Sequence, residues 1–207
     1  MFRKLTMIGL AALLLGGCAI GTTPLNVTHE PLAKIEAKKS GNILVRTFVD
    51  RRKEEHQYIG NKRNGFGMVL GHVGLKDGQT LEGLLTGYFA GALREAGYNA
   101  VIQGEPGADA QQVKFDAVVE GEIVEFWLDL YMKVWHNVEV KTRVVSPVNQ
   151  AVLWERTVQA DQSNVLWIGA SGEFERVINE ALTKALNQAA ADYASNDFQQ
   201  AVNKKAL

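Results

Sequence analysis

The chain is poor in cysteine, in excess charge and in long apolar runs, and each scarcity excludes a class of protein. Cys18 is the single cysteine among 207 residues, so neither an intramolecular disulfide nor a cysteine metal cluster can form. The formal net charge is -1, from 22 basic and 23 acidic side chains, which leaves no basic surface for nucleic acid. No apolar run reaches the roughly 20 residues that a membrane-spanning helix needs.

What is present begins with an export signal over residues 1–17. Arg3 and Lys4 supply a positive start, residues 5–15 form an apolar run, and Gly16 and Gly17 follow. This three-part pattern is typical of a signal peptide. The alternative, a buried N-terminal helix of a cytosolic protein, fits poorly with the two early charges and the abrupt Gly-Gly-Cys stop.

The end of this signal resembles the lipobox of bacterial lipoproteins, in the residues Leu15-Gly16-Gly17-Cys18. The resemblance implies cleavage before Cys18 and lipidation of that residue, with diacylglycerol on its sulfur and fatty acid such as palmitate on its amino group. Two or three acyl chains hold a protein firmly on a membrane. Soluble secretion is the alternative, because a cut after Ala19 loosely fits the small-x-small rule.

Residue 19 bears on which membrane carries the anchor. In lipoproteins of enteric-type bacteria, Asp at this position favours the inner membrane, and this chain has Ala19. The resemblance therefore implies the outer membrane, with the domain facing the periplasm. We expect the lipidated Cys18 and a flexible tether over residues 18–41, because this stretch has two prolines and no sustained periodicity.

The rest of the chain predicts one α+β domain over residues 42–194, followed by a polar tail over 195–207. Apolar side chains recur at helical spacing in 81–96, between the N-cap candidate Thr80 and Gly97. A second helix is expected at 173–193, with Ser171 as its N-cap. Strands are predicted at 43–50, 99–103, 117–128, 134–145 and 151–160. The predicted fold class is two helices packed on a largely antiparallel sheet of about four to five strands, in β-α-β-β-β-α order.

The sequence contains no catalytic, metal or cofactor constellation. Its four histidines are scattered without an i, i+4 pair, and an enzyme would require an unforeseen meeting of groups such as His72, Asp50 and Glu120. The glycines of residues 60–78 have the wrong spacing for a dinucleotide loop, so we interpret them as turns and a mobile hairpin. We predict that the protein is not an enzyme and has no cofactor.

Aromatic residues around one turn form a candidate interaction patch: Trp127, Tyr131 and Trp135, with Trp167 as a further member. Trp127 and Trp135 would lie opposite each other in a hairpin centred near Tyr131. Such a pair either completes the core or binds a protein or the bilayer interface. Both interpretations remain open.

Three segments resemble the YajG-like group of uncharacterised bacterial lipoproteins. They are Phe48-Val49-Asp50-Arg51-Arg52, Ile59-Gly60 with Arg63-Asn64-Gly65, and residues 81–97 with the following Tyr98. The element order also resembles domains of envelope-assembly lipoproteins, such as activators of peptidoglycan synthases and curli-secretion components. The YajG-like group brings no established activity to carry over. The expected anchor and tether and a domain without a catalytic cluster favour a non-enzymatic lipoprotein that binds another envelope protein. The alternative is a small-molecule or lipid carrier, with a pocket between helices and sheet.

Overall fold

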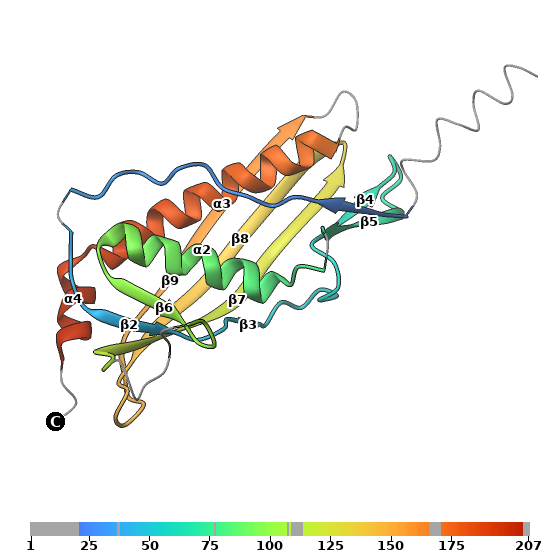
Figure 1. The fold of residues 1–207 in the computed structure, drawn as a ribbon. Coiled ribbons are helices and arrows are strands. Elements are labelled where there is room, and N and C mark those ends of the chain that lie inside the picture. Colours follow the sequence, from blue (N-terminus) through green and yellow to red (C-terminus); the bar gives the residue numbers. More distant parts are fainter. Residues whose placement is uncertain are drawn as a thin grey trace, which may run out of the picture.

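The computed structural model describes residues 21–36, 38–76, 78–106, 108, 114–165 and 171–204 (Figure 1). Cys18 and Trp167 lie outside these ranges. The strands are β1 (Gly21–Leu25), β2 (Asn42–Val45), β3 (Val49–Asp50), β4 (Gly60–Arg63), β5 (Val69–Leu75), β6 (Asn99–Ile102), β7 (Ala117–Tyr131), β8 (Lys133–Val145) and β9 (Val152–Val165). The helices are α2 (Leu81–Ala96), α3 (Ser171–Tyr193) and α4 (Asn196–Asn203).

The predicted fold class is wrong in the size and the strand directions of the sheet. Instead of four to five largely antiparallel strands under two helices, the described residues form a nine-stranded mixed sheet and three helices. The antiparallel pairs are β7–β8 and β8–β9, as expected, and also β4–β5. The parallel part pairs β1 with β5, β2 with β6, and β2, β3 and β4 with β7.

The length of β7 explains most of the parallel pairing. Its 15 residues extend about 50 Å, and β2, β3 and β4 pair in succession along one of its edges. The strand expected at 43–50 is therefore two short strands. It breaks before Phe48, whose backbone N–H donates to Thr86 Oγ1 of α2 at 2.9 Å instead of to the sheet. The Phe48 ring lies on Gly121 of β7, where an added Cβ would be 2.5 Å from the ring.

The helices α2 and α3 lie side by side on one face of the sheet (Figure 1). The boundaries predicted for α2 are confirmed: Thr80 Oγ1 accepts from the Gly83 N–H at 3.2 Å, and Gly97 ends the helix at φ 107°. Leu85, Phe89 and Leu93 of α2 are fully buried. Burying each such side chain stabilises the fold by about 1.5–3 kcal/mol.

Much of the segment expected to be a tether is a fixed part of the domain. Residues 21–25 form β1, and residues 26–33 run along α3 (Figure 1). Backbone N–H groups of this segment donate to side chains of α3: Asn26 to Glu175, Thr28 to Asn179, Glu30 to Thr183 and Ala33 to Asn187, at 2.7–3.0 Å. Two residues of extended chain advance about 6.6 Å and four residues of helix about 6.0 Å. The two spacings therefore match over the contacts of Asn26, Thr28 and Glu30, and the last contact comes three residues later, at Ala33.

The expected polar C-terminal tail contains the helix α4. Ser195 caps its N-terminus by accepting from the Phe198 N–H at 3.2 Å. Phe198 and Val202 are buried, and Phe198 packs edge-on against Trp154 of β9 with ring centroids 4.9 Å apart. Two apolar residues spaced one turn apart in a polar sequence are enough to dock a short helix. Composition alone suggested solvent-exposed chain.

The face of β7–β9 turned away from the helices, called the outer face below, is polar. Arg143 of β8 pairs with Glu120 of β7 at 2.8 Å, and Lys141 pairs with Glu155 of β9 at 2.9 Å. In β8 the predicted alternation is confirmed, because His136, Val138, Val140, Thr142 and Val144 are buried beneath the helices. The helices thus cover a single face of the long strands.

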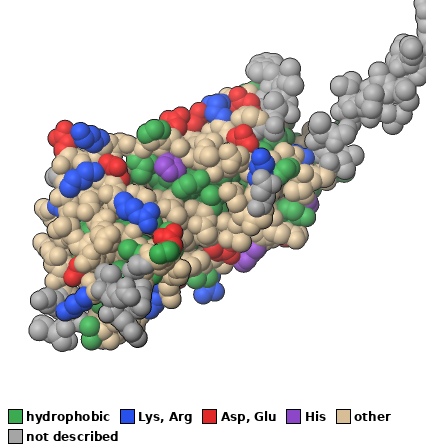
Figure 2. All heavy atoms as spheres, in the orientation of Figure 1, with side chains coloured by type: hydrophobic (Ala, Val, Ile, Leu, Met, Phe, Trp, Pro, Cys, Tyr) green, Lys and Arg blue, Asp and Glu red, His purple; other side chains and the backbone are tan. Residues whose placement is uncertain are grey.

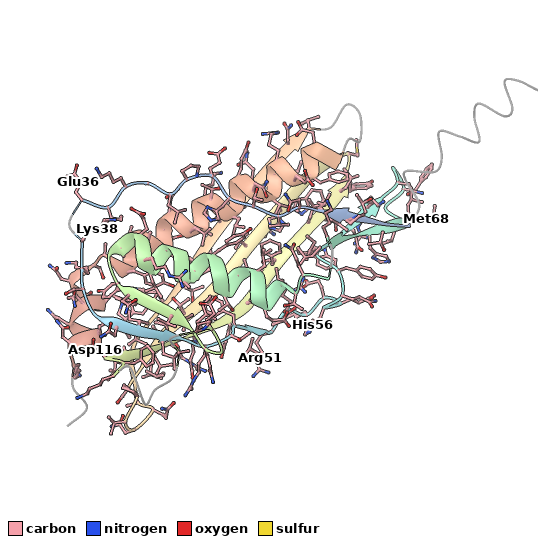
Figure 3. The ribbon with its side chains drawn as sticks, viewed as in Figure 1. Glu36, Lys38, Arg51, His56, Met68 and Asp116 are labelled. Carbon is pink, nitrogen blue, oxygen red and sulfur yellow. The ribbon has the colours of Figure 1, made fainter. Side chains whose placement is uncertain are left out.

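The two ends of the sheet carry different structures. One end, called the hairpin end below, contains the β4–β5 turn at residues 64–68 and the β7–β8 turn at Met132. The opposite end carries α4 and the turn between β8 and β9. Figure 3 shows Met68 at the hairpin end and Glu36 and Asp116 at the other end.

Candidate functional site

The predicted aromatic patch lies on the outer face at the hairpin end. Trp127 and Tyr131 come from β7 and Trp135 from β8, at positions that alternate with the buried Phe126, Leu128 and Val134. Cys18 and Trp167, the other predicted site residues, lie outside the described residues. The aromatic patch is here the three side chains Trp127, Tyr131 and Trp135.

The turn is centred one residue later than expected, so the expected pairing of Trp127 with Trp135 is wrong by two residues. Tyr131 pairs with Lys133 across a turn at Met132, which adopts φ 61°. Trp127 is therefore opposite Asn137, and Trp135 is opposite Asp129. The two tryptophans are diagonal neighbours, a relation that places Cα atoms about 7–8 Å apart. Both are half-buried, and neither belongs to the core between sheet and helices.

The aromatic patch is tied to the β4–β5 hairpin by polar contacts. Arg63 Nε donates to both carboxylate oxygens of Asp129, at 2.9 and 3.0 Å. Tyr131 Oη donates to the Gly65 carbonyl at 3.3 Å. The Lys133 ammonium lies 5.8 Å from the ring centroid of Trp135. The two hairpins therefore form one continuous surface.

A surface hollow of about 480 Å³ adjoins Trp127. The Tyr58 and His72 rings stack there with centroids 3.9 Å apart and planes 6° from parallel, and His72 Nδ1 lies 3.0 Å from Asn61 Oδ1. Aromatic faces beside charges of both signs suit a polar partner with planar or aliphatic groups. The hollow is lined by Lys53, Glu54, Glu55, Tyr58, Asn61, Val69, His72 and Trp127.

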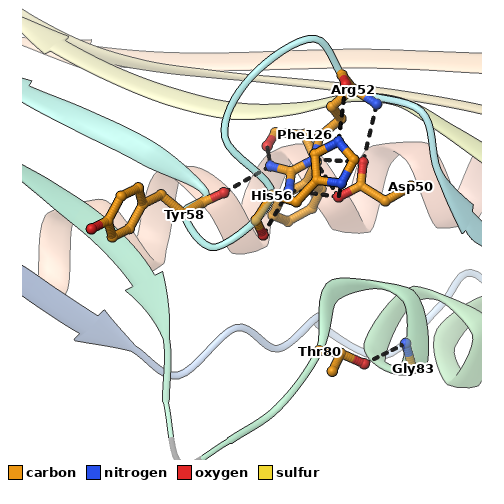
Figure 4. A network of polar contacts seen from close by, with 7 residues as sticks. All are labelled: Asp50, Arg52, His56, Tyr58, Thr80, Gly83 and Phe126. Carbon is orange, nitrogen blue, oxygen red and sulfur yellow. Dashed lines mark hydrogen bonds and ion pairs between the residues drawn. The ribbon is translucent and has the colours of Figure 1, made fainter.

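One wall of this hollow is shaped by the buried ion pair of Asp50 and Arg52 (Figure 4). The Arg52 side chain is 0% exposed. Its guanidinium donates to both Asp50 carboxylate oxygens at 2.7–3.1 Å and to the carbonyls of Tyr58, Phe126 and His56. Burial alone would raise the pKa of Asp50, but the hydrogen bonds and charge of Arg52 lower it below the ordinary value. The pair fixes the path of residues 51–58.

Asp50 and Arg52 belong to a mixed-charge run at a strand end, Asp50-Arg51-Arg52-Lys53-Glu54-Glu55, and these two are buried although charged side chains are mostly exposed. Arg51 and Lys53 between and beyond them are exposed. The signal in the sequence was the alternation itself: Asp50 and Arg52 continue the inward-facing positions of a strand. Their opposite charges allow both to be buried together.

Exposed apolar side chains gather beyond the hollow, at the two turns. Phe66 is 89% exposed, Met132 76% and Met68 60%. These three, with the partly exposed Val69 and Leu70 of β5, are called the apolar tip below. Figure 2 shows this end at the right of the view, where apolar side chains reach the surface among polar atoms.

His136 is buried without a compensating contact. It lies on β8 beneath the helices, with its ring edge-on to Phe126 at a centroid distance of 4.5 Å. Within the described part of the chain, neither ring nitrogen has a hydrogen-bond partner. Burial is the main cause that lowers the pKa of His136 to about 3. The Trp127 backbone raises this pKa to a lesser degree, and the charge of Arg52 lowers it further. The ring is neutral, which suits a core residue.

The groups from which an enzyme would have to be built have separate partners. Asp50 is held by Arg52, His72 lies against Tyr58 and Asn61, and Glu120 pairs with Arg46 and Arg143. Among residues 21–204, apart from the undescribed gaps, no group of three or more His, Cys, Asp or Glu is placed to hold a metal ion. None of the described helices is both long and apolar enough to cross a bilayer.

The interior gives no support to the carrier alternative. α2, whose Leu84–Leu93 stretch would line the expected pocket, buries its apolar side chains in the core. Four hollows of about 330–500 Å³ on the described surface are lined by polar and apolar side chains together, and no residue of α2 lines any of the four.

Comparisons with known proteins show which solved structures share the fold of this chain. No family model and no curated protein matches the chain. The solved structure of protein XCC0632 from Xanthomonas campestris, of the family DUF330, has a TM-score of 0.57 at 15% identity, covering 87% of this chain and 97% of that one. Lipoprotein GNA1162 from Neisseria meningitidis has a TM-score of 0.38 at 19% identity, covering 73% and 99%. The first similarity shows a shared fold alone, and the second is too weak to support an argument. The resemblance to the YajG-like group stays a prediction.

Proposed function

We propose that the chain is a non-enzymatic lipoprotein, anchored to the outer membrane through lipid on Cys18 and facing the periplasm, where it binds another envelope protein. The observation that carries this proposal is the apolar run that ends in Leu15-Gly16-Gly17-Cys18. Two or three acyl chains buried in the bilayer would keep even a polar domain attached to the membrane.

The pairing of β1 with the sheet supports this proposal. Gly21 is the first residue of β1, which pairs along its length with β5. The candidate anchor is therefore three residues from the domain instead of at the end of a long tether. A protein held in this way would present a defined side to the membrane.

The aromatic patch is the surface we propose for the partner. Trp127 and Trp135 are half-buried on a face that none of the described helices covers, and the hollow beside Trp127 adds Tyr58 and His72. Tryptophan and tyrosine are enriched among the residues that dominate protein–protein binding energy. An envelope protein offering aliphatic groups and mixed charge would fit this surface.

The anchor is tested by growing cells with an alkyne analogue of palmitate. We expect label on the wild-type chain, none on Cys18→Ala, and recovery of the wild type in the outer-membrane fraction. Ala19→Asp serves as a sorting variant, and we expect it to keep the label while moving to the inner membrane. A mature N-terminus at Ile20, or an unlabelled wild type that is freely soluble, would contradict the proposal.

The partner surface is tested by a photo-crosslinking amino acid placed at position 135 in intact cells. Position 148 is the matched control, because Val148 is 79% exposed in the turn at the opposite end of β8. A specific adduct at 135 that is missing at 148 is expected. The same adducts at both positions, or none at 135, would count against the aromatic patch.

A further inference from the structure

The described chain enters the sheet from the side of the apolar tip. β1 runs parallel to β5, and Gly21 pairs with Gly71, two residues after Val69 begins β5. Following β1 backwards from Gly21 therefore leads toward the β4–β5 turn. Three residues of chain span at most about 11 Å, so Cys18 is confined to that distance from Gly21.

Strand pairing places this entry point level with both turns. A row of paired residues crosses the sheet in the order Gly21, Gly71, Lys62, Leu130, Val134 and Asn164. Beyond the row, toward the hairpin end, lie the two turns and the apolar tip. The candidate lipid anchor and the apolar tip therefore belong to the same end of the sheet.

The apolar tip is held in place by its own hydrogen bonds. Asn64 Oδ1 accepts from the N–H groups of Phe66 and Met68, at 2.9 and 3.0 Å, and the Asn64 N–H donates to the Met68 carbonyl at 3.0 Å. Arg63 reaches the Gly67 carbonyl at 3.2 Å. Phe66 and Met68 are therefore exposed side chains of an ordered turn.

We infer that the apolar tip inserts into the interface of the bilayer that carries the lipid on Cys18, so that the domain has a second membrane contact. This inference rests on the proposed lipidation. Phe66, Met68 and Met132 would leave water for the boundary between headgroups and acyl chains, where apolar side chains are favoured. The tip is too small to hold a protein by itself. The anchor holds it within a few ångströms of the bilayer, which raises its effective concentration there.

This contact fixes the orientation of the domain. With the hairpin end on the membrane, β7, β8 and β9 point away from it, and 15 residues of β7 reach about 50 Å into the periplasm. The turn containing Val148 and the helix α4 would lie farthest from the bilayer. The outer face, with its aromatic patch near the base, would stand open to a partner beside it.

The test uses the full lipidated chain reconstituted into vesicles of phosphatidylethanolamine and phosphatidylglycerol. Acylation blocks Cys18, the single native cysteine, so a nitroxide attaches to one introduced cysteine alone. We compare Phe66→Cys and Met68→Cys with the control Val148→Cys, which is similarly exposed at the opposite end. We expect the labels at 66 and 68 to be several-fold less accessible to a water-soluble nickel reagent than the label at 148 in the same vesicles. Their accessibility to oxygen, which concentrates in the bilayer, should be higher than that of the label at 148.

The outcomes separate the inference from the proposal beneath it. Vesicle-bound protein whose labels at 66 and 68 remain as accessible to nickel as the label at 148 would overturn the membrane contact and leave the anchor intact. Shielding from nickel and oxygen together, with spin–spin broadening between labels, would assign the tip to a second copy of the chain and also overturn the inference. A chain whose Cys18 takes the nitroxide and that stays off the vesicles would overturn both.

Discussion

Gly71 of β5 lies so close to Gly21 of β1 that a Cβ on Gly71 would be 2.2 Å from the Gly21 carbonyl oxygen. This contact lies at the N-terminal end of the β1–β5 pairing. Lys62 strengthens it, because its Nζ donates to Thr23 Oγ1 of β1 at 2.8 Å. Glycine at position 71 is thus required by the approach of a neighbouring strand and not by a turn.

We predict that Gly71→Ala displaces β1 from β5, because the added methyl group cannot share space with the Gly21 backbone. Overpacking of this kind typically costs about 1–3 kcal/mol. Hydrogen exchange at residues 21–25 should accelerate, and the free energy of unfolding should fall. Gly65→Ala is the matched control, since its Cβ would meet no atom within 4 Å. Equal exchange rates in the two variants would contradict the prediction.

Asn179→Ala should free the backbone of Thr28 from α3. The Thr28 N–H donates to Asn179 Oδ1 at 2.9 Å, and a hydrogen bond of this type contributes about 0.5–1.5 kcal/mol. Exchange of the Thr28 amide, followed by NMR, should become faster while the Ala33 amide is unaffected. Asn187→Ala should produce the reverse, because Asn187 accepts from Ala33. If each variant changed both amides alike, the contacts would not act separately.

Asp50→Asn should destabilise the domain strongly, because it leaves the charge of Arg52 buried without its partner. Removing one member of a buried ion pair typically costs about 3–5 kcal/mol. Denaturant unfolding measures this loss. The exposed pair of Lys38 and Glu95, 2.8 Å apart, provides the control, and Glu95→Gln should give an unfolding curve like that of the wild type. A small effect of Asp50→Asn would mean that water reaches Arg52.

His136 should make the domain sensitive to acid. Its pKa is about 3 in the folded chain and about 6.5 in an unfolded one, so between these pH values the unfolded state binds the extra proton. Stability is therefore fully present above pH ~6.5 and falls by about 1.4 kcal/mol per pH unit as the pH decreases toward ~3. His136→Leu removes this slope. Parallel curves of unfolding free energy against pH for the two proteins would show the prediction to be wrong.

Local patterns predicted the long elements well. Helical spacing between Thr80 and Gly97 placed α2 at its observed bounds, and alternation placed β8 with its buried face correctly. The predicted strand 117–128 extends to Tyr131, and the one at 151–160 shifts to β9, ending at Val165. Such segments carry their own periodicity, because one face of each is buried along many residues.

The short elements were missed because their partners are distant in the chain. β1 contains Pro24 and has no alternation, yet as an edge strand of the sheet it can include a residue without an N–H. Phe48 seemed to belong to a continuous strand, but its N–H bonds to Thr86. The glycines at positions 60 and 71 suggested turns, whereas each accommodates the backbone of a neighbouring strand.

Some features of the candidate site could be identified from the sequence, and others could not. The sequence identified the aromatic residues of the β7–β8 hairpin, and it carries the lipobox-like motif at Cys18 on which the proposed anchor depends. It could not show that Trp127 and Trp135 lie on the outer face, nor that Asp50 and Arg52 form a buried pair that bonds to the carbonyls of His56 and Tyr58.

What the sequence determined by itself is what depends on neighbours along the chain, namely helix caps and strand alternation. Only the tertiary structure decided that β1 pairs with β5, that residues 26–33 follow α3, and that the apolar tip lies level with the entry of the chain. The physical reason is that these contacts join segments far apart in the chain, as the Thr28 N–H and the Asn179 side chain of α3 do across 151 residues. Local periodicity holds no record of such partners.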